Sequence, residues 1–121
     1  MPTETTRVDS PIETVNEVKL VGRVTRDAVV TELPSGDELV TFRISVGRND
    51  RDRDQKRKVD SVPCCAWSSK VRRSTRTWRA GDVVEVAGAV RSRFFQTARG
   101  LGSRVEVEVQ SARIVSRAPA A

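Results

Sequence analysis

Apolar and polar residues alternate along most of this chain, which is typical of β-strands with one buried face. We expect five strands, at residues 18–30, 41–46, 59–67, 84–95 and 105–110. The last is the most regular, because Val105, Val107 and Val109 face one way while Glu106, Glu108 and Gln110 face the other. Pro63 lies inside the third strand and lacks a backbone N–H, so we expect that strand to lie at an edge or beside a bulge.

Helical periodicity is confined to residues 69–79, a short basic segment in which Val71 and Trp78 lie on one face. The chain therefore predicts an all-β domain with one short helix between its third and fourth strands. That order of elements is typical of a five-stranded OB-fold barrel. Gly22 and Gly88 fall within strands, where glycine permits the sharp coiling that barrel closure requires.

Four segments are expected to lie outside the barrel. Residues 1–14 are interpreted as a flexible N-terminal segment and residues 116–121 as a short disordered C-terminus, which leaves 15–115 as the domain. Residues 48–58 contain no apolar side chain and are predicted to form a mobile hairpin loop. Residues 96–103 carry two glycines and are predicted to form a second loop.

The composition favours an anionic partner. The chain has 22 Lys and Arg residues against 16 Asp and Glu residues, which gives a net charge of +6. The positive excess lies between Lys70 and Arg104. Nucleic acid is the first candidate partner, and an anionic membrane surface is the second. Most of the cations are arginine, which suits bidentate phosphate contacts and planar stacking.

Several classes of function are disfavoured. No apolar run is long enough to span a membrane, and the first residues lack the pattern of a secretory signal. Cys64 and Cys65 are adjacent and the chain has no histidine, so we expect no disulfide between distant segments, no metal site and no cofactor. The commonest general acid–base side chain is also missing. We therefore expect a reduced, cytoplasmic protein that is not an enzyme.

The segment 91–95 carries the strongest sign of function. In an extended strand, Arg91, Arg93 and Phe95 share one face. Two guanidinium groups followed by an aromatic ring suit a phosphate and an unstacked base. In the simpler alternative, Phe94 enters the core, while Phe95 and the arginines cover a solvated face.

Two groups of cations and one tryptophan are further candidates. The 48–58 loop is either a solvated charge run that pairs with itself or a flexible segment laid along a phosphate backbone. In the second case its expected phosphate contacts are Lys56, Arg57 and Lys58, which have no acid between them. Arg72 and Arg73 belong to a crowd of cations in the helical segment, which is either a polyanion contact or simply an exposed surface. Trp67 ends the third strand, as a core residue or a stacking platform, whereas we expect Trp78 in the core.

Three segments then resemble one family over residues 15–115. They are VNEVKLVG at 15–22, FRISV at 42–46, and GDVVEVAG at 81–88 followed by VRSR at 90–93. Their order and spacing are similar to those of the bacterial single-stranded DNA-binding proteins. The resemblance implies an OB barrel that binds single strands through aromatic rings and basic residues, usually as a homotetramer. It matches Trp67 and Phe95 to stacking aromatics, and Arg91 and Arg93 to a basic pair.

The chain departs from that family in three places. Two expected tryptophans are absent, at about Asp50 and Ser61. The chain ends at 116–121 without an acidic residue, so we do not expect recruitment of partner proteins through an acidic tail. These departures are those expected of a short paralogue within the family. Two alternatives stay open, namely an RNA-binding or primosome-type OB protein, and a structural assembly subunit with Trp67 and Phe95 as interface anchors.

Overall fold

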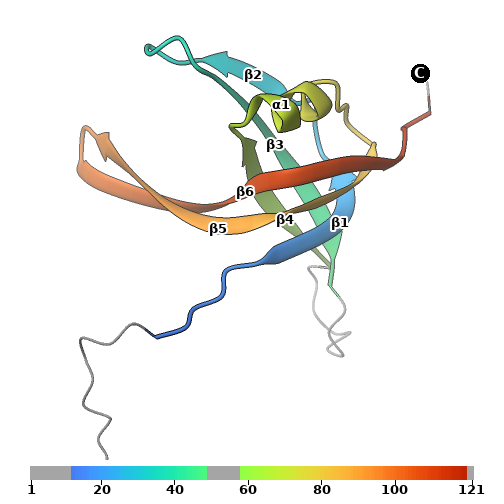
Figure 1. Ribbon diagram of the computed structural model, residues 1–121, viewed down its shortest axis with the longest axis horizontal. Helices are drawn as coiled ribbons and strands as arrows, with labels where there is room; N and C mark the ends of the chain where they lie inside the picture. Colours follow the sequence, from blue (N-terminus) through green and yellow to red (C-terminus); the bar gives the residue numbers. More distant parts are fainter. Residues whose placement is uncertain (1–11, 49–57, 120–121) are drawn as a thin grey trace, which may run out of the picture.

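The computed structural model describes residues 12–48 and 58–119 (Figure 1). Its elements follow the chain in the order β1 Val18–Val24, β2 Val29–Glu32, β3 Glu38–Gly47, β4 Val59–Ala66, α1 Ser69–Thr75, β5 Val83–Thr97 and β6 Gly100–Ser116. The helix follows the strand at 59–66 and precedes the strand at 83–97, in the place that the sequence predicts.

The sheet closes on itself. Its strand order is β1-β5-β6-β4-β3, and β3 pairs with β1 to complete the ring. The pairing of β4 with β6 is parallel, at Cys64 and Cys65, and the other pairings are antiparallel. The predicted five-stranded OB barrel is therefore confirmed. The expected first strand is divided, however, because residues 25–28 leave the ladder and β2 pairs only with β3.

The core contains one tryptophan and a set of aliphatic residues from the barrel strands. Trp78 is 1% exposed, and its ring meets Phe42 edge-on at 5.0 Å between centroids. The prediction that Trp78 lies in the core is confirmed. The predicted helix over 69–79 is too long, because α1 ends at Thr75 and Trp78 reaches the core from the segment that follows. Ser68 caps the helix, since its hydroxyl accepts a hydrogen bond from the Val71 N–H.

Glycine allows backbones to approach closely at two points of the barrel. A Cβ atom at Gly88 would overlap the carbonyl oxygen of Glu108, and one at Gly22 would overlap that of Ser45. The β5–β6 register also shifts between Ala87 and Gly88. These glycines thus lie where the strands bend around the barrel, as the sequence predicts.

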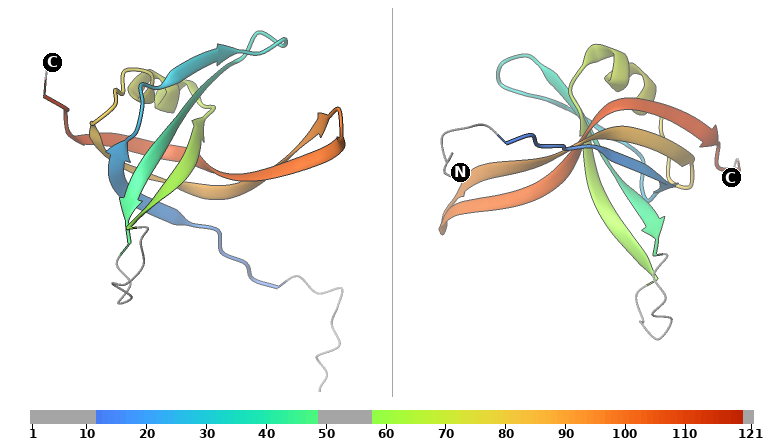
Figure 2. Two further views of the ribbon diagram at one scale, coloured as in Figure 1. Left: turned by 180° about the vertical axis from the view of Figure 1, so that it is seen from behind. Right: turned by 60° about the horizontal axis from the view of Figure 1, so that its bottom comes forward.

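A long hairpin projects from the barrel. The predicted loop at 96–103 is wrong, because β5 continues to Thr97 and β6 begins at Gly100. Gly100 has φ +120°, which lets the chain reverse within two residues. Beyond Ala89 of β5 and before Val107 of β6, the two strands pair only with each other. We call this two-stranded extension the arm (Figures 1 and 2).

The arm has two different faces, and its root is clamped by Asn16. The side-chain amide of Asn16 donates to the Val90 carbonyl oxygen and accepts from the Val90 N–H, both at 2.8 Å. On the arm, Val105 is 59% exposed and Glu106 only 7%. The expected alternation at 105–110 is present, but the exposed and buried sides are exchanged at these two positions.

The end of β6 is attached to the start of β5. Asp82 is 2% exposed and accepts hydrogen bonds from the backbone N–H groups of Arg79 and Ala118, and it also pairs with the Arg117 guanidinium at 3.1 Å. Arg117 and Ala118 fall in the segment 116–121 that the sequence assigns to a terminal tail. Within the two described ranges, no helix has the length and apolar character needed to cross a membrane.

Candidate nucleic-acid interface

The segment 91–95 and the end of β4 come together on the outer surface of the barrel. Arg91, Arg93 and Phe95 point to one side of β5, as the alternation predicts. The guanidinium carbon of Arg93 lies 5.5 Å from the centroid of the Trp67 ring, within the range of a cation–π contact. We call this surface, formed by Trp67, Arg91, Arg93 and Phe95, the ledge.

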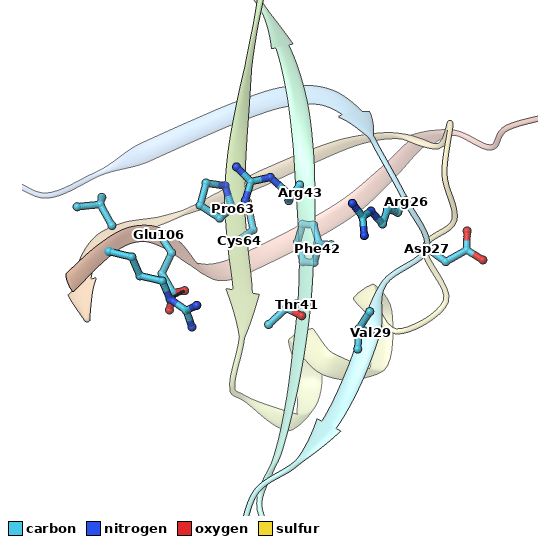
Figure 3. Close-up of a pocket in the computed structure, with 11 residues that line it drawn as sticks. Arg26, Asp27, Val29, Thr41, Phe42, Arg43, Pro63, Cys64 and Glu106 are labelled. Carbon is cyan, nitrogen blue, oxygen red and sulfur yellow. Dashed lines mark ion pairs between the residues drawn. The ribbon is translucent and has the colours of Figure 1, made fainter. Parts of the chain in front are cut away.

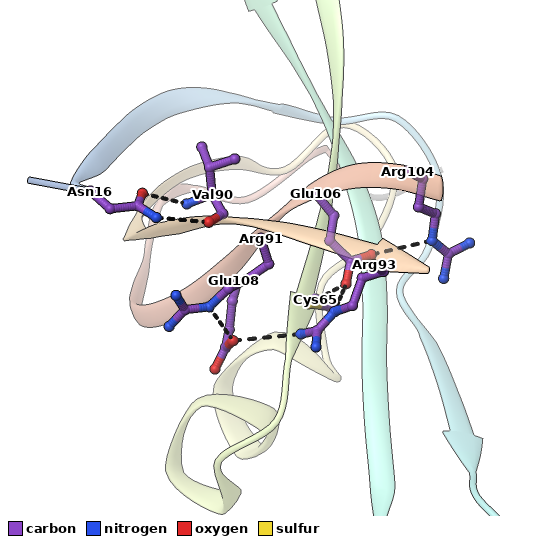
Figure 4. Close-up of polar contacts among 8 residues, drawn as sticks. All are labelled: Asn16, Cys65, Val90, Arg91, Arg93, Arg104, Glu106 and Glu108. Carbon is purple, nitrogen blue, oxygen red and sulfur yellow. Dashed lines mark hydrogen bonds and ion pairs between the residues drawn. The ribbon is translucent and has the colours of Figure 1, made fainter. Parts of the chain in front are cut away.

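Two glutamates of β6 hold the arginines of the ledge (Figure 4). Arg93 Nε donates to Glu106 Oε2 at 2.9 Å, and Arg91 Nε donates to Glu108 Oε1 at the same distance. A second nitrogen of Arg93 lies 3.5 Å from Glu108 Oε1. The two guanidinium groups are therefore fixed in place and partly neutralised. Sequence reasoning missed these partners, because cross-strand neighbours depend on a register that a single strand pattern does not reveal.

Glu106 is the most buried member of this network. It accepts from Arg93 and from the Cys65 thiol, whose Sγ lies 3.2 Å from Oε2, and Arg104 lies 3.6 Å from its other oxygen. Burial raises the pKa of Glu106, but these hydrogen bonds and the arginine charges outweigh burial, so its pKa lies below the ordinary value of 4.5. Glu106 is thus a charged, fully engaged carboxylate beneath the ledge.

Phe95 lies at the outer end of the ledge. It is 43% exposed, and its ring covers Gly102, where an added Cβ atom would come within 2.6 Å of the ring. The Arg104 guanidinium lies 6.0 Å from the ring centroid. Phe94 points to the opposite face of the arm and is 73% exposed. The alternative that places Phe94 in the core is therefore wrong.

The remaining predicted cations are spread over the molecule. Arg72 donates to the Trp67 carbonyl oxygen and pairs with Glu38 at 3.2 Å, so it holds the backbone that carries Trp67. Arg73 is exposed on α1, and Lys58 is exposed at the other end of β4. The other two predicted loop cations, Lys56 and Arg57, lie outside the described residues, as does the position at Asp50.

A groove of about 620 Å³ lies beside the ledge, between β3, β4, β6 and the segment joining β1 to β2 (Figure 3). Its charged lining consists of three arginines, Arg26, Arg43 and Arg104, and two acidic residues, Asp27 and Glu106. Arg43 Nε donates to the Ser61 hydroxyl at 2.9 Å, and a second nitrogen donates to the Ser61 carbonyl oxygen at 3.3 Å. Arg43 faces outward because it alternates along β3 with the buried Phe42 and Ile44.

Pro63 lines the groove, and the strand pairing at Pro63 explains why the groove forms there. At Pro63 the strand β4 pairs with Arg43 of β3 but not with β6, which joins β4 only at Cys64 and Cys65. The expectation of an edge position is therefore met locally. The separation of β4 from β6 at this point opens the groove.

Cys64 and Cys65 are buried and free. Burial raises the pKa of the Cys64 thiol to about 12 and that of Cys65 to about 11, with neighbouring negative charges adding to the rise. The reactive thiolate is therefore scarce at neutral pH. Within the part of the chain that the structure describes, no cluster of cysteine and carboxylate side chains has the grouping of a metal site.

Comparison with known proteins points to one family. Residues 15–116 match the sequence model of the single-strand binding protein family. "Single-stranded DNA-binding protein 1" of Streptococcus agalactiae serotype III (strain NEM316) is 30% identical over 86 residues, covering 71% of this chain and 53% of that protein. The protein of the same name in Streptococcus pyogenes serotype M18 (strain MGAS8232) is 25% identical, covering 85% of this chain and 80% of that one.

The fold is also similar to a solved structure described as "Plasmodium falciparum SSB complex with ssDNA". That chain has a TM-score of 0.69 and 20% identity, and the match covers 88% of this chain and 98% of that one. At this identity the likeness concerns the fold. The chain spans about half the length of the first relative named above.

Proposed function

Because this chain belongs to the single-strand binding protein family, we propose that it binds single-stranded DNA with little sequence preference and catalyses no reaction. The observation that carries the proposal is the ledge, which combines the rings of Trp67 and Phe95 with two arginines whose positions are fixed by glutamates. The two streptococcal relatives described above carry names that refer to binding and not to a reaction.

The ledge suits an unpaired strand for a simple physical reason. Every base has a π-face, so stacking on Trp67 or Phe95 is worth roughly 1–3 kcal/mol per base whatever its identity. Arg91 and Arg93 supply positive charge along the same line. A duplex hides its bases in the stack, so rings of this kind favour a single strand.

The proposal extends to assembly and location. We infer a homo-oligomer, with a homotetramer as the expected form, that acts with the nucleoid in the cytoplasm. The arm supports association, because its second face exposes two large apolar side chains, Phe94 at 73% and Leu101 at 76%. An exposed apolar surface of this kind is typical of a contact between proteins.

Titration of labelled oligo-dT at two salt concentrations tests the proposal. We expect binding at low salt that weakens as salt rises, because phosphate contacts release counterions. Phe95→Ala should weaken binding by about 1–3 kcal/mol, since it removes one of the two rings. Fluorescence anisotropy of the labelled oligonucleotide measures both effects.

Phe94→Ala is the matched control, because it removes the neighbouring ring from the opposite face of the arm. Because Phe94 belongs to the face that supports association, the comparison uses an oligo-dT short enough to occupy one subunit, and Phe94→Ala should leave that affinity almost unchanged. A folded parent protein that binds no oligo-dT at low salt would contradict the proposed function. Equal losses in the two variants would instead remove Phe95 from the site.

A further inference from the structure

We propose that the groove is a second nucleotide subsite, in which the guanidinium plane of Arg43, held by Ser61, takes the place of an aromatic ring. The subsite would accept one nucleotide of a single strand, with its base against Arg43 and its phosphate near Arg26 or Arg104. This inference rests on the proposed function and adds to it a site outside the ledge.

Two hydrogen bonds fix the orientation of the Arg43 guanidinium plane. Two of its nitrogens donate to two oxygens of Ser61, on the neighbouring strand β4, at 2.9 and 3.3 Å. These contacts orient the plane of the guanidinium group while its side chain stays exposed. A planar guanidinium group is a known stacking partner for an unpaired base.

The charge of Arg43 is available to a ligand. Within residues 12–48 and 58–119, neither Arg43 nor Arg26 has a carboxylate partner within ion-pair distance. This contrasts with Arg91 and Arg93 of the ledge, which are paired with glutamates. A phosphate that bound Arg43 or Arg26 would therefore displace no carboxylate from either guanidinium group, whereas the third arginine of the groove, Arg104, lies 3.6 Å from Glu106.

The shape and position of the groove fit a nucleotide. Its volume of about 620 Å³ lies within the usual range of small-ligand sites. Pro63 and Val105 provide apolar surface for a base, and Figure 3 shows Arg43 beside Pro63. Arg104 lines the groove and also stands over the Phe95 ring, so the groove is continuous with the ledge. One strand could then pass from Phe95 into the groove.

Two substitutions separate stacking from charge. Arg43→Lys keeps the positive charge but loses the planar guanidinium group. Oligo-dT binding should therefore weaken about fivefold or more, which is the lower limit for the loss of one stacking contact. The slope of log K against log salt should stay unchanged. Arg43→Gln loses both, so binding should weaken further and the slope of log K against log salt should fall by about 0.7. Anisotropy titrations of labelled oligo-dT provide both quantities.

Arg113→Gln is the control, because Arg113 is also an exposed arginine of a strand but pairs with Glu85 outside the groove. It should bind like the parent. If Arg43→Lys or Arg43→Gln binds like the parent in folded samples, the second subsite is wrong while the ledge stands. If the parent itself binds no oligo-dT, the proposed function and the subsite fail together. The Arg43 Nε–H signal in an NMR spectrum should also shift when oligo-dT is added, and a fixed signal would count against the subsite.

Discussion

Glu106 is buried at a position where strand alternation alone predicts a solvent-facing carboxylate. Its burial is explained by its neighbours, because Arg93 and the Cys65 thiol donate hydrogen bonds to Oε2, and the Arg104 guanidinium lies 3.6 Å from Oε1. The carboxylate in turn fixes Arg93 above the Trp67 ring. A single acidic residue thus fixes the arginine that contacts one of the two rings of the ledge.

The charged form of Glu106 should stabilise the fold in a pH-dependent way. Its pKa is lowered in the folded state, so this stabilisation is complete above the ordinary value of 4.5 and is lost as the pH falls through the folded value. We expect Glu106→Gln to lower the free energy of unfolding by about 1–2 kcal/mol near pH 7. The difference in stability between about pH 7 and about pH 3 should become smaller in the variant. Urea unfolding at the two pH values measures both.

A comparison variant is Glu32→Gln, at an exposed glutamate of β2 without an ion-pair partner among the described residues. It should leave the stability near pH 7 almost unchanged. Some acid sensitivity should survive in Glu106→Gln, because Asp82 also has a lowered pKa: burial raises it, but hydrogen bonds from Ala118, Arg79 and Arg117 prevail. An unaltered pH dependence in Glu106→Gln would contradict the role given to Glu106.

At the scale of elements, the bend of β5 determines where the arm leaves the barrel. The register with β6 shifts at Gly88, and the carbonyl oxygen of Glu108 occupies the space where a Cβ atom would lie. The bend therefore depends on the absence of a side chain. It also directs residues 91–95 away from the barrel core, so the ledge depends on it.

Gly88→Ala should destabilise the protein. Relief of the overlap requires a backbone shift in β5 or β6, which we expect to cost about 1–3 kcal/mol of unfolding free energy. Thermal or urea unfolding measures the loss. Gly47→Ala is the control at the end of β3, because a Cβ atom there meets nothing within 4 Å. Its stability should change by no more than about 0.5 kcal/mol, and equal effects of the two substitutions would contradict the close-approach explanation.

At the scale of the whole molecule, the ledge and the attachment of the C-terminal segment lie at different ends of the barrel. In Figure 1 the arm extends to one side, and the chain end after β6 lies on the other. Asp82 connects that chain end to the start of β5 through Ala118 and Arg117. Stability and binding should therefore respond separately to changes at the two ends.

Asp82→Asn tests that separation. It removes the negative charge and leaves buried donors less well satisfied, so the free energy of unfolding should fall by about 1–3 kcal/mol. The affinity of the folded variant for oligo-dT should match that of the parent. Differential scanning calorimetry and anisotropy titration at a temperature where the variant is folded measure the two quantities. A large loss of affinity in the folded variant would show that the two ends are coupled.

The sequence predicted the barrel because alternation, turn residues and one short helical segment all pointed to the same order of elements. Prediction from the sequence failed where the structure depends on contacts between strands. The glycines at 100 and 102 were interpreted as loop residues, whereas Gly100 forms a tight turn and Gly102 makes room for the Phe95 ring. The division of the first strand at 25–28 also followed from tertiary hydrogen bonds, such as that from the Ala28 N–H to the Trp78 carbonyl oxygen.

The candidate site could be predicted only in part, again because some of its contacts lie between strands. Alternation correctly placed Arg91, Arg93 and Phe95 on one face. Trp67, which follows the end of β4, was expected beside them, and its ring contacts Arg93. The pairing of these arginines with Glu106 and Glu108 required the β5–β6 register. The groove required the separation of β4 from β6, which no pattern within a single strand encodes.

The arm gives the two rings of the ledge unequal stiffness. Trp67 follows a strand of the closed barrel, whereas Phe95 lies on a two-stranded ribbon that has no third strand to support it. A ribbon of two strands bends more easily than a closed barrel. We therefore expect the spacing between the two rings to vary with the bend of the ribbon, and a ligand that holds the ribbon in one bend to cost conformational entropy.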